Sequence, residues 1–235
     1  MNEDVLYVAQ LRSYFSDTPE FFNQCMEYPG GLLRWLGLWL TQLFYHPWMG
    51  ITALILIWCT SLLILKQAFK VRLAWAPLLL IPIVCLIAAN IQVGYWIYYL
   101  KFPGYYFYGS LGVLCVSLLV WLATSENKYL AAMGCILSAL SYPLIGSYAP
   151  LAMACTAFML LLNKRWSLGG IMAVATIAAP ILWTTLYDTY PADKTFTISI
   201  PVFEYGEYTN YSKGAPFYIL FIALFLMPLL TSYRN

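Results

Sequence analysis

Long apolar runs dominate the chain from residue 48 to its end, and short polar or turn-forming stretches separate them. Runs of this length and composition are typical of helices that lie in lipid rather than in water. We therefore predict an all-α fold, a polytopic transmembrane helix bundle of about seven spans. The predicted spans are residues 48–65, 73–91, 105–124, 129–146, 149–162, 168–187 and 216–231.

A shorter amphipathic stretch, residues 32–45, precedes these runs, between a Pro-Gly-Gly break and a His-Pro-Trp break. At about 1.5 Å per residue it spans roughly 21 Å, which is less than the ~30 Å hydrocarbon core of a bilayer. One side of the helix is apolar and the other polar, and only Leu38 departs from this division. We therefore predict an amphipathic interfacial helix over 32–45 with its apolar face toward the membrane. Its polar side holds Arg34, Gly37, Thr41, Gln42 and Tyr45.

These patterns divide the chain into a helical, water-exposed segment, 1–47, and a transmembrane bundle, 48–235. Thr18 followed by Pro19 is typical of a helix start, because Thr caps orphan amides and Pro fits the first turn. Gly30 and Gly31 should end that helix.

A polar loop, 188–215, interrupts the bundle. Apolar residues alternate near its start, which predicts a short strand that Pro201 confines to a sheet edge. The alternating residues are Phe196, Ile198, Ile200 and Val202.

The composition agrees with a membrane protein: 62% of the residues are hydrophobic and 9% are charged, whereas soluble domains carry about 25% charged residues. The formal net charge of +2 is too small to indicate a nucleic-acid partner. The six cysteines form no Cys-x-x-Cys pair and no cluster with the one histidine, so no metal site is predicted. No motif specifies a cofactor.

The distribution of charges predicts the orientation, because short cytoplasmic loops carry an excess of Lys and Arg. If the spans alternate, every acid except Glu126 falls on the side of the N-terminus. We therefore predict that the N-terminus and the 188–215 loop lie on the outer side of the membrane and that the C-terminus is cytoplasmic. The bases on the predicted cytoplasmic side are Lys66, Lys70, Arg72, Lys128, Lys164, Arg165 and Arg234.

Three short motifs resemble the opening of an uncharacterised family of bacterial multi-pass inner-membrane proteins. They are Pro29-Gly30-Gly31, the Thr-Gln-x-Phe-Tyr motif at 41–45 and the Pro-Trp-x-Gly motif at 47–50. The resemblance covers about 30 residues and implies the bacterial inner membrane, so that the predicted outer side, with the N-terminus and the 188–215 loop, is the periplasm. Members of that family begin with another span and continue beyond residue 235, so the resemblance also implies missing flanking membrane segments.

The layout also resembles that of the membrane-embedded C-superfamily glycosyltransferases. In those enzymes an outer loop with an early acidic pair and membrane-surface helices follows a first span. Glu3 and Asp4 match the acidic pair, and residues 32–45 match a surface helix. This resemblance implies a polyprenyl-phosphate-linked donor at the periplasmic face.

Seven residues are candidates for such chemistry. Glu3, Asp4 and His46 are the catalytic candidates, since carboxylates and imidazole can move protons. Helix-terminal acids and a structural interfacial histidine are the alternative interpretations.

Arg34 and Lys101 could hold a phosphate. An aromatic run, 94–109, surrounds Lys101. In it Tyr95 and Trp96, with Tyr99 and Tyr105, could stack on a sugar or prenyl chain; an aromatic belt is the alternative explanation of the run. For catalysis, Glu3 or Asp4 should share one periplasmic cavity with the basic groups.

Two functions fit these observations. The first is a glycosyltransferase-like module that uses a lipid-linked donor. The second is a non-catalytic envelope scaffold or assembly partner, or a fragment of a longer membrane protein. The sequence contains no motif that decides whether the protein is an enzyme, and the one partner common to both interpretations is the lipid bilayer.

Overall fold

The structure is a computed structural model that describes residues 3–69, 71, 73–93, 104–186, 195–199, 203–205, 208–210 and 215–229. The N-terminal elements are α1 (Glu3–Arg12), α2 (Pro19–Met26), α3 (Gly31–Thr41) and the 3-10 helix η1 (Gln42–Tyr45). The later ones are α4 (Pro47–Ala68), the 3-10 helix η2 (Leu73–Leu79), α5 (Leu80–Val93), α6 (Tyr105–Ala123), α7 (Lys128–Leu140), α8 (Tyr142–Ile145), α9 (Tyr148–Leu162), α10 (Trp166–Thr184), β1 (Phe203–Tyr205), β2 (Tyr208–Asn210) and α11 (Ala215–Leu226).

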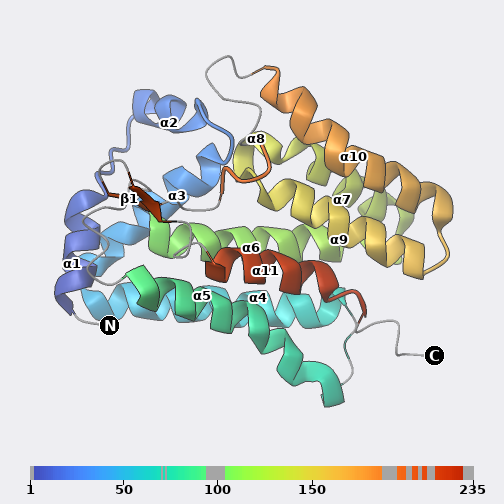
Figure 1. The fold of residues 1–235 in the computed structure, drawn as a ribbon, viewed down its shortest axis with the longest axis horizontal. Helices are drawn as coiled ribbons and strands as arrows, with labels where there is room; N and C mark the ends of the chain where they lie inside the picture. Colours follow the sequence, from blue (N-terminus) through green and yellow to red (C-terminus); the bar gives the residue numbers. More distant parts are fainter. Residues whose placement is uncertain are drawn as a thin grey trace.

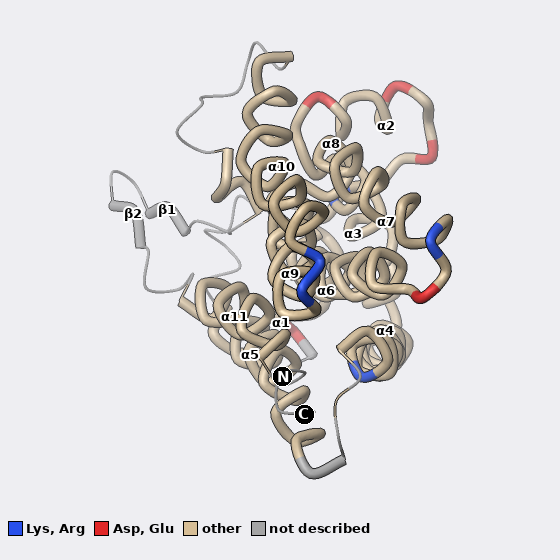
Figure 2. Tube along the Cα trace, turned by 90° about the vertical axis from the view of Figure 1, so that its right-hand side faces the viewer, with Lys and Arg blue, Asp and Glu red and all other residues tan. Residues whose placement is uncertain are grey.

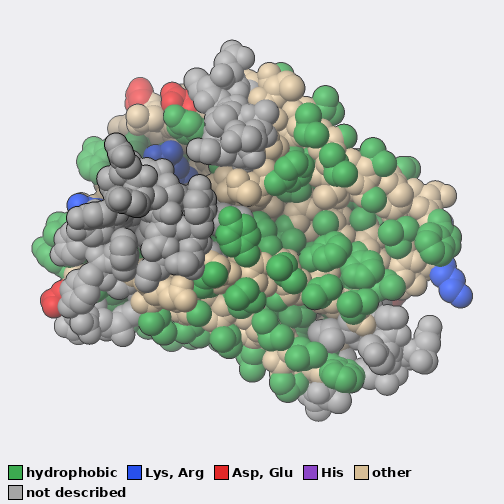
Figure 3. Space-filling model, in the orientation of Figure 1, with side chains coloured by type: hydrophobic (Ala, Val, Ile, Leu, Met, Phe, Trp, Pro, Cys, Tyr) green, Lys and Arg blue, Asp and Glu red, His purple; other side chains and the backbone are tan. Residues whose placement is uncertain are grey.

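The long helices lie side by side along the long axis of the molecule, and α1, α2 and α3 gather at one end (Figure 1). We call this the α3 end. The opposite end is formed by the last turn of α4, the first turn of α7 and the turn between α9 and α10. Seen along the bundle in Figure 2, α6 and α9 lie near the middle and α4 and α10 lie toward the outside. On the face shown in Figure 3, hydrophobic side chains cover the middle and charged ones lie at the two ends.

The fold is essentially all-α, as predicted, and each predicted span contains a helix. Two spans are divided, however: 129–146 into α7 and α8, and 73–91 into η2 and α5. Four helical stretches are long and apolar enough to cross a membrane: α4, Trp75–Val93, α6 and α10. Helices α7, α9 and α11 have 13, 15 and 12 residues. At about 1.5 Å per residue these cover roughly 18–23 Å, less than the ~30 Å core. The structure therefore gives a multi-pass membrane protein with four candidate spans and three shorter apolar helices.

The strand prediction in the 188–215 loop was wrong for the residues that the structure describes. Residues 195–199 form a turn rather than a strand. The antiparallel pair of strands lies further along, where Glu204 is opposite Thr209. Side chains hold the turn: the Tyr142 hydroxyl donates to the Thr195 carbonyl oxygen, and the Ser199 amide donates to Ser147 Oγ. These bonds satisfy backbone groups that a ladder would otherwise have paired.

Large rings placed on glycines hold the core together. A Cβ on Gly112 would lie 2.3 Å from the Tyr148 ring, and one on Gly50 would lie 2.2 Å from Phe44. Tyr148 and Phe44 are both fully buried. A small residue in one helix therefore makes the space that a ring from another element fills.

Burial on α3 does not follow the predicted polar and apolar sides. Gly37 and Thr41 of the polar side are buried, whereas Trp39 of the apolar side is 51% exposed. Leu38, the one apparent exception, is only 2% exposed. The cause is a backbone contact with the start of α6, since a Cβ on Gly37 would lie 3.0 Å from the Gly104 carbonyl oxygen. The buried Thr41 hydroxyl has a hydrogen-bond partner within α3, because it donates to the Gly37 carbonyl oxygen at 2.6 Å.

The elements before α3 complete the α3 end. The amide of Phe21 donates to Thr18 Oγ1 at 3.3 Å, which confirms Thr18 as the N-cap of α2. The helix ends at Met26, before the predicted glycines, and Gly30 instead precedes α3. Helix α1 packs on η1, where Gln42 Nε2 donates to the carbonyl oxygen of Ser13.

Candidate functional site

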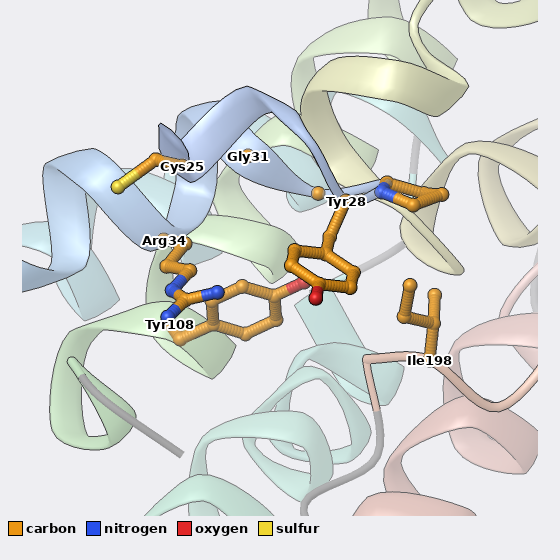
Figure 4. A pocket seen from close by; sticks show the side chains of 8 residues that line it. Cys25, Tyr28, Gly31, Arg34, Tyr108 and Ile198 are labelled. Atoms are coloured by element: carbon orange, nitrogen blue, oxygen red, sulfur yellow. The ribbon is translucent and has the colours of Figure 1, made fainter. Parts of the chain in front are cut away.

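A cavity of about 140 Å³ opens at the α3 end, where three parts of the chain meet (Figure 4). The turn between α2 and α3 forms one wall, α6 contributes Tyr108, and the 195–199 turn contributes Ile198. We call it the Arg34 cavity. It is lined by Cys25, Tyr28, Pro29, Gly30, Gly31, Arg34, Tyr108 and Ile198.

Gly30 shapes the wall of the cavity at the start of α3. Its φ of +88° lies in the left-handed region, where a side chain is strained. A Cβ there would also lie 2.4 Å from the Tyr108 hydroxyl oxygen. The Gly30 amide donates to the Pro143 carbonyl oxygen at 2.9 Å, which ties this wall to α8. Only glycine can make the turn and leave room for the tyrosine.

The 195–199 turn is tied down by buried hydrogen bonds to three other elements. Ser199 Oγ accepts from the Ser147 amide at 2.9 Å and pairs with the Tyr108 hydroxyl at 3.0 Å. In return, the Ser199 amide donates to Ser147 Oγ at 3.2 Å. The Tyr142 hydroxyl donates to the Thr195 carbonyl at 2.8 Å. The wall that carries Ile198 is therefore fixed to α6, α8 and the start of α9.

Arg34 supplies the positive charge of the cavity. Its side chain is half-buried, and its Nε lies out of contact with solvent without a hydrogen-bond partner among the residues that the structure describes. Its Cζ lies 6.0 Å from the centre of the Tyr28 ring, at the outer limit of a cation–π contact. In Figure 4 the guanidinium extends alongside Tyr108. A guanidinium donor buried without a partner is costly, and an incoming acceptor would remove that cost.

Cys25 borders the same cavity and is 3% exposed. Burial raises the pKa of its thiol above the ordinary value of 9.0, and the nearby Arg34 charge lowers it by less. Cys25 is therefore a neutral thiol at physiological pH, and it does not supply a counter-charge to Arg34.

The donors around the cavity suit a small anion. Arg34 provides a planar set of N–H groups, and the amino end of α3 points its partial positive charge at the Gly30–Gly31 wall. No Asp or Glu is among the described residues that line it. Its volume of about 140 Å³ is below the roughly 300 Å³ of a typical small-molecule site, so it has room for a headgroup-sized anion rather than a whole sugar chain.

Of the candidate site residues, the structure places Arg34 in this cavity. Asp4 is exposed on α1, and His46 is exposed at the start of α4 with its ring 4.9 Å from that of Tyr45. Neither lines the cavity. Glu3 begins α1, and Tyr95, Trp96 and Lys101 lie outside the described residues. The catalytic roles of Glu3, Asp4 and His46 stay predictions.

The described part of the aromatic run, at the start of α6, is buried in the bundle. Tyr105 is 4% exposed, and its hydroxyl donates to the Ala89 carbonyl at 3.1 Å. Tyr106 and Phe107 pack around the Phe44 ring. The interpretation of Tyr105 as a stacking platform for a sugar was therefore wrong, because its faces are covered by protein.

Sequence reasoning missed Tyr108, Gly146, Ser147 and Ser199 as parts of the site. Gly146 has a φ of +58°, and a Cβ there would lie 2.6 Å from Ser199 Oγ. These residues belong to segments more than 30 residues apart, and no local pattern marks their contact. The one available signal was the Gly-Ser pair between two apolar runs.

Comparison with known families gave one match. The sequence model described as "Family of unknown function (DUF6057)" matches residues 1–234. No curated protein and no solved structure matches the chain.

Proposed function

We propose that this chain, which belongs to the DUF6057 family, binds a phosphate-class anion in the Arg34 cavity as a multi-pass membrane protein. The family has no assigned activity, so the proposal rests on geometry. The observation that carries it is the Arg34 guanidinium, whose Nε is buried on the cavity wall without a partner in the described part of the chain.

We place the α3 end on the periplasmic side of a bacterial inner membrane, with seven crossings and a cytoplasmic C-terminus. Successive apolar helices run in alternate directions in Figure 1. The described bases at the opposite end are consistent with a cytoplasmic surface, which attracts Lys and Arg. They are Lys66, Lys128, Lys164 and Arg165. Short helices such as α7 can cross where the bilayer thins locally.

The finer hypothesis is transfer of a group from a polyprenyl-phosphate-linked donor. Such a reaction needs an acid or base within hydrogen-bond reach of the bound group. Binding is the step that the cavity supports best, because its described lining has one cation and no carboxylate. Binding of the anion would serve either of two functions. One is group transfer, with Glu3 or Asp4 and His46 in catalytic roles. The other is that of a non-catalytic envelope scaffold.

Equilibrium titration of the full chain in detergent with glycerol 1-phosphate tests the proposal. Because charged hydrogen bonds contribute about 1.5–3 kcal/mol, R34Q should weaken binding roughly 10- to 100-fold. R34K keeps the positive charge but loses the planar guanidinium, so its affinity for glycerol 1-phosphate should lie between that of R34Q and that of the unsubstituted chain. The matched control is R165Q at the opposite end, where binding should be unchanged. Equal affinities for R34Q and the unsubstituted chain would refute the proposal.

A further inference from the structure

An apolar groove of about 260 Å³ lies between α6, α7 and α8. Leu118, Leu137, Leu140 and Leu144 line it and are partly exposed. Because α6 is a candidate membrane span, this part of the surface faces hydrocarbon when the chain is in a bilayer. The remaining lining residues are Cys115, Leu119, Ser141 and Ile145.

The groove and the Arg34 cavity share two elements. Tyr108 lines the cavity and Cys115 lines the groove. Residues seven apart lie on the same face of a helix, about 10 Å apart along its axis. The second shared element is α8, whose Pro143 accepts from Gly30 in the cavity wall and whose Leu144 lines the groove.

The surface that connects them runs over α8. Along α6 itself, the buried Tyr148 ring fills the space at Gly112 between the two sites. On α8, by contrast, Pro143 is half-buried and Leu144 is 38% exposed. A flexible chain that starts at the cavity therefore reaches the groove across the outer side of Pro143 and Leu144.

We infer that the ligand of the Arg34 cavity is a membrane lipid with a phosphate headgroup, whose aliphatic chain crosses α8 and lies in the groove. This inference rests on the proposed anion site and adds the second half of the ligand. The cavity offers donors and room for a headgroup alone, and the groove offers apolar contacts with no charged side chain among the described residues that line it. A single amphipathic molecule satisfies both, and its polar and apolar parts would lie at depths that match a membrane surface and its interior.

Photo-crosslinking of the full chain in nanodiscs with a dodecyl phosphate that carries a diazirine near its chain end tests the inference. We expect labels in residues 115–119 and 137–145, and loss of those labels when excess glycerol 1-phosphate competes for the cavity. R34Q should lower this labelling about tenfold, the loss of one charged hydrogen bond.

A groove-filling variant separates the inference from the anion site. L137W should reduce labelling of the groove while the affinity for glycerol 1-phosphate stays unchanged. The matched control is I177W on α10, since Ile177 is also exposed and apolar, and it should leave labelling unchanged. If glycerol 1-phosphate binds through Arg34 but the labels spread over α4 and α10, the inference is wrong and the anion site stands. If glycerol 1-phosphate does not bind, the proposed function itself fails.

Discussion

The two ends of the bundle both carry a residue in the left-handed backbone region, and they use different residues there. At the α3 end glycines take this conformation, and one of them, Gly30, lies against Tyr108 in a tightly packed wall. At the opposite end it is Lys164, with a φ of 57° and an exposed side chain. Lys164 sits just after α9 and forms a helix-ending turn in which its amide and that of Arg165 donate to the Leu161 and Leu160 carbonyls.

The difference reflects how tightly the backbone is packed at each end. The α3 end joins distant segments through buried hydrogen bonds and has room for glycine only, which is how a cavity is kept in shape. The opposite end accepts the strain of a left-handed lysine where glycine would be easier. A positive charge at a turn between two apolar helices favours a cytoplasmic position, which gives a reason for lysine there. Tight packing therefore determines the residue at the α3 end, and positive charge explains the residue at the opposite end.

The largest effect is expected from Gly30→Ala. The left-handed backbone costs an L-residue about 1–2 kcal/mol, and the contact with the Tyr108 hydroxyl forces further movement, so we expect about 3 kcal/mol of destabilisation. Thermal unfolding in detergent measures it. The control is Gly170→Ala on α10, where a Cβ meets nothing within 4 Å and helix propensity favours alanine by about 0.8–1 kcal/mol. Equal effects at the two positions would contradict the packed wall.

Ser199→Ala should come next. It removes the shared partner of the Tyr108 hydroxyl and the Ser147 amide, and unsatisfied buried groups cost about 1–3 kcal/mol. We expect about 2 kcal/mol from the same unfolding measurement. The matched variant is Thr60→Ala, because the exposed Thr60 hydroxyl donates only within its own helix, to Leu56. A Ser199→Ala protein as stable as Thr60→Ala would show that the 195–199 turn is not held to the bundle.

Lys164→Gly should change stability in the opposite direction. Glycine relieves the left-handed strain at this helix end, so we expect a gain of about 1 kcal/mol. It also removes one of the bases that favour a cytoplasmic position, so accessibility labelling should find a less uniform orientation in cells. A loss of stability would mean that the Lys164 side chain makes a contact that offsets the strain.

The smallest effect concerns the Cys25 thiol. Because burial raises its pKa, the folded state favours the neutral thiol. The resulting stability is fully present below the ordinary thiol pKa and is lost as the pH rises through the higher folded value. Alkylation of Cys25, followed by peptide mass spectrometry, should reach half its maximal rate above pH 9. Arg34→Gln should move this midpoint further upward, and a midpoint at or below that of the unfolded chain would refute the burial argument.

The positions of the helices could be predicted from the sequence because hydrophobic runs and helix-start signals are local. Thr18 and Pro19 mark the start of α2, and each apolar run contains a helix, although the runs 73–91 and 129–146 are each divided in two. Which helix is covered by protein could not be predicted in this way. In α9, 11 of the 15 residues are buried, whereas in α10 only 4 of the 19 are, although both are apolar. Hydropathy measures preference for an apolar environment and does not separate protein from lipid.

The site was predictable only at Arg34, a charge on an otherwise apolar short helix. Its neighbours Tyr108 and Ser199 come from segments 91 residues apart, and pairing at that separation depends on tertiary packing. The helical projection placed Gly37 on the polar side of α3, with Arg34 and Thr41. In the structure its missing side chain allows α3 to contact the backbone of α6. A helical projection does not show whether a glycine lies on a solvated surface or at a close contact between two backbones.

In the proposed function, the buried Arg34 Nε–H donates a hydrogen bond to a bound anion. Nitrogen-15 NMR of the full chain can follow the arginine Nε–H groups individually while glycerol 1-phosphate is added, with R34Q to assign the signal. We predict that the Arg34 signal shifts with saturation and that its hydrogen exchange slows, while the Arg165 signal stays in place. An Arg34 signal that does not move at phosphate concentrations that saturate binding would contradict the account.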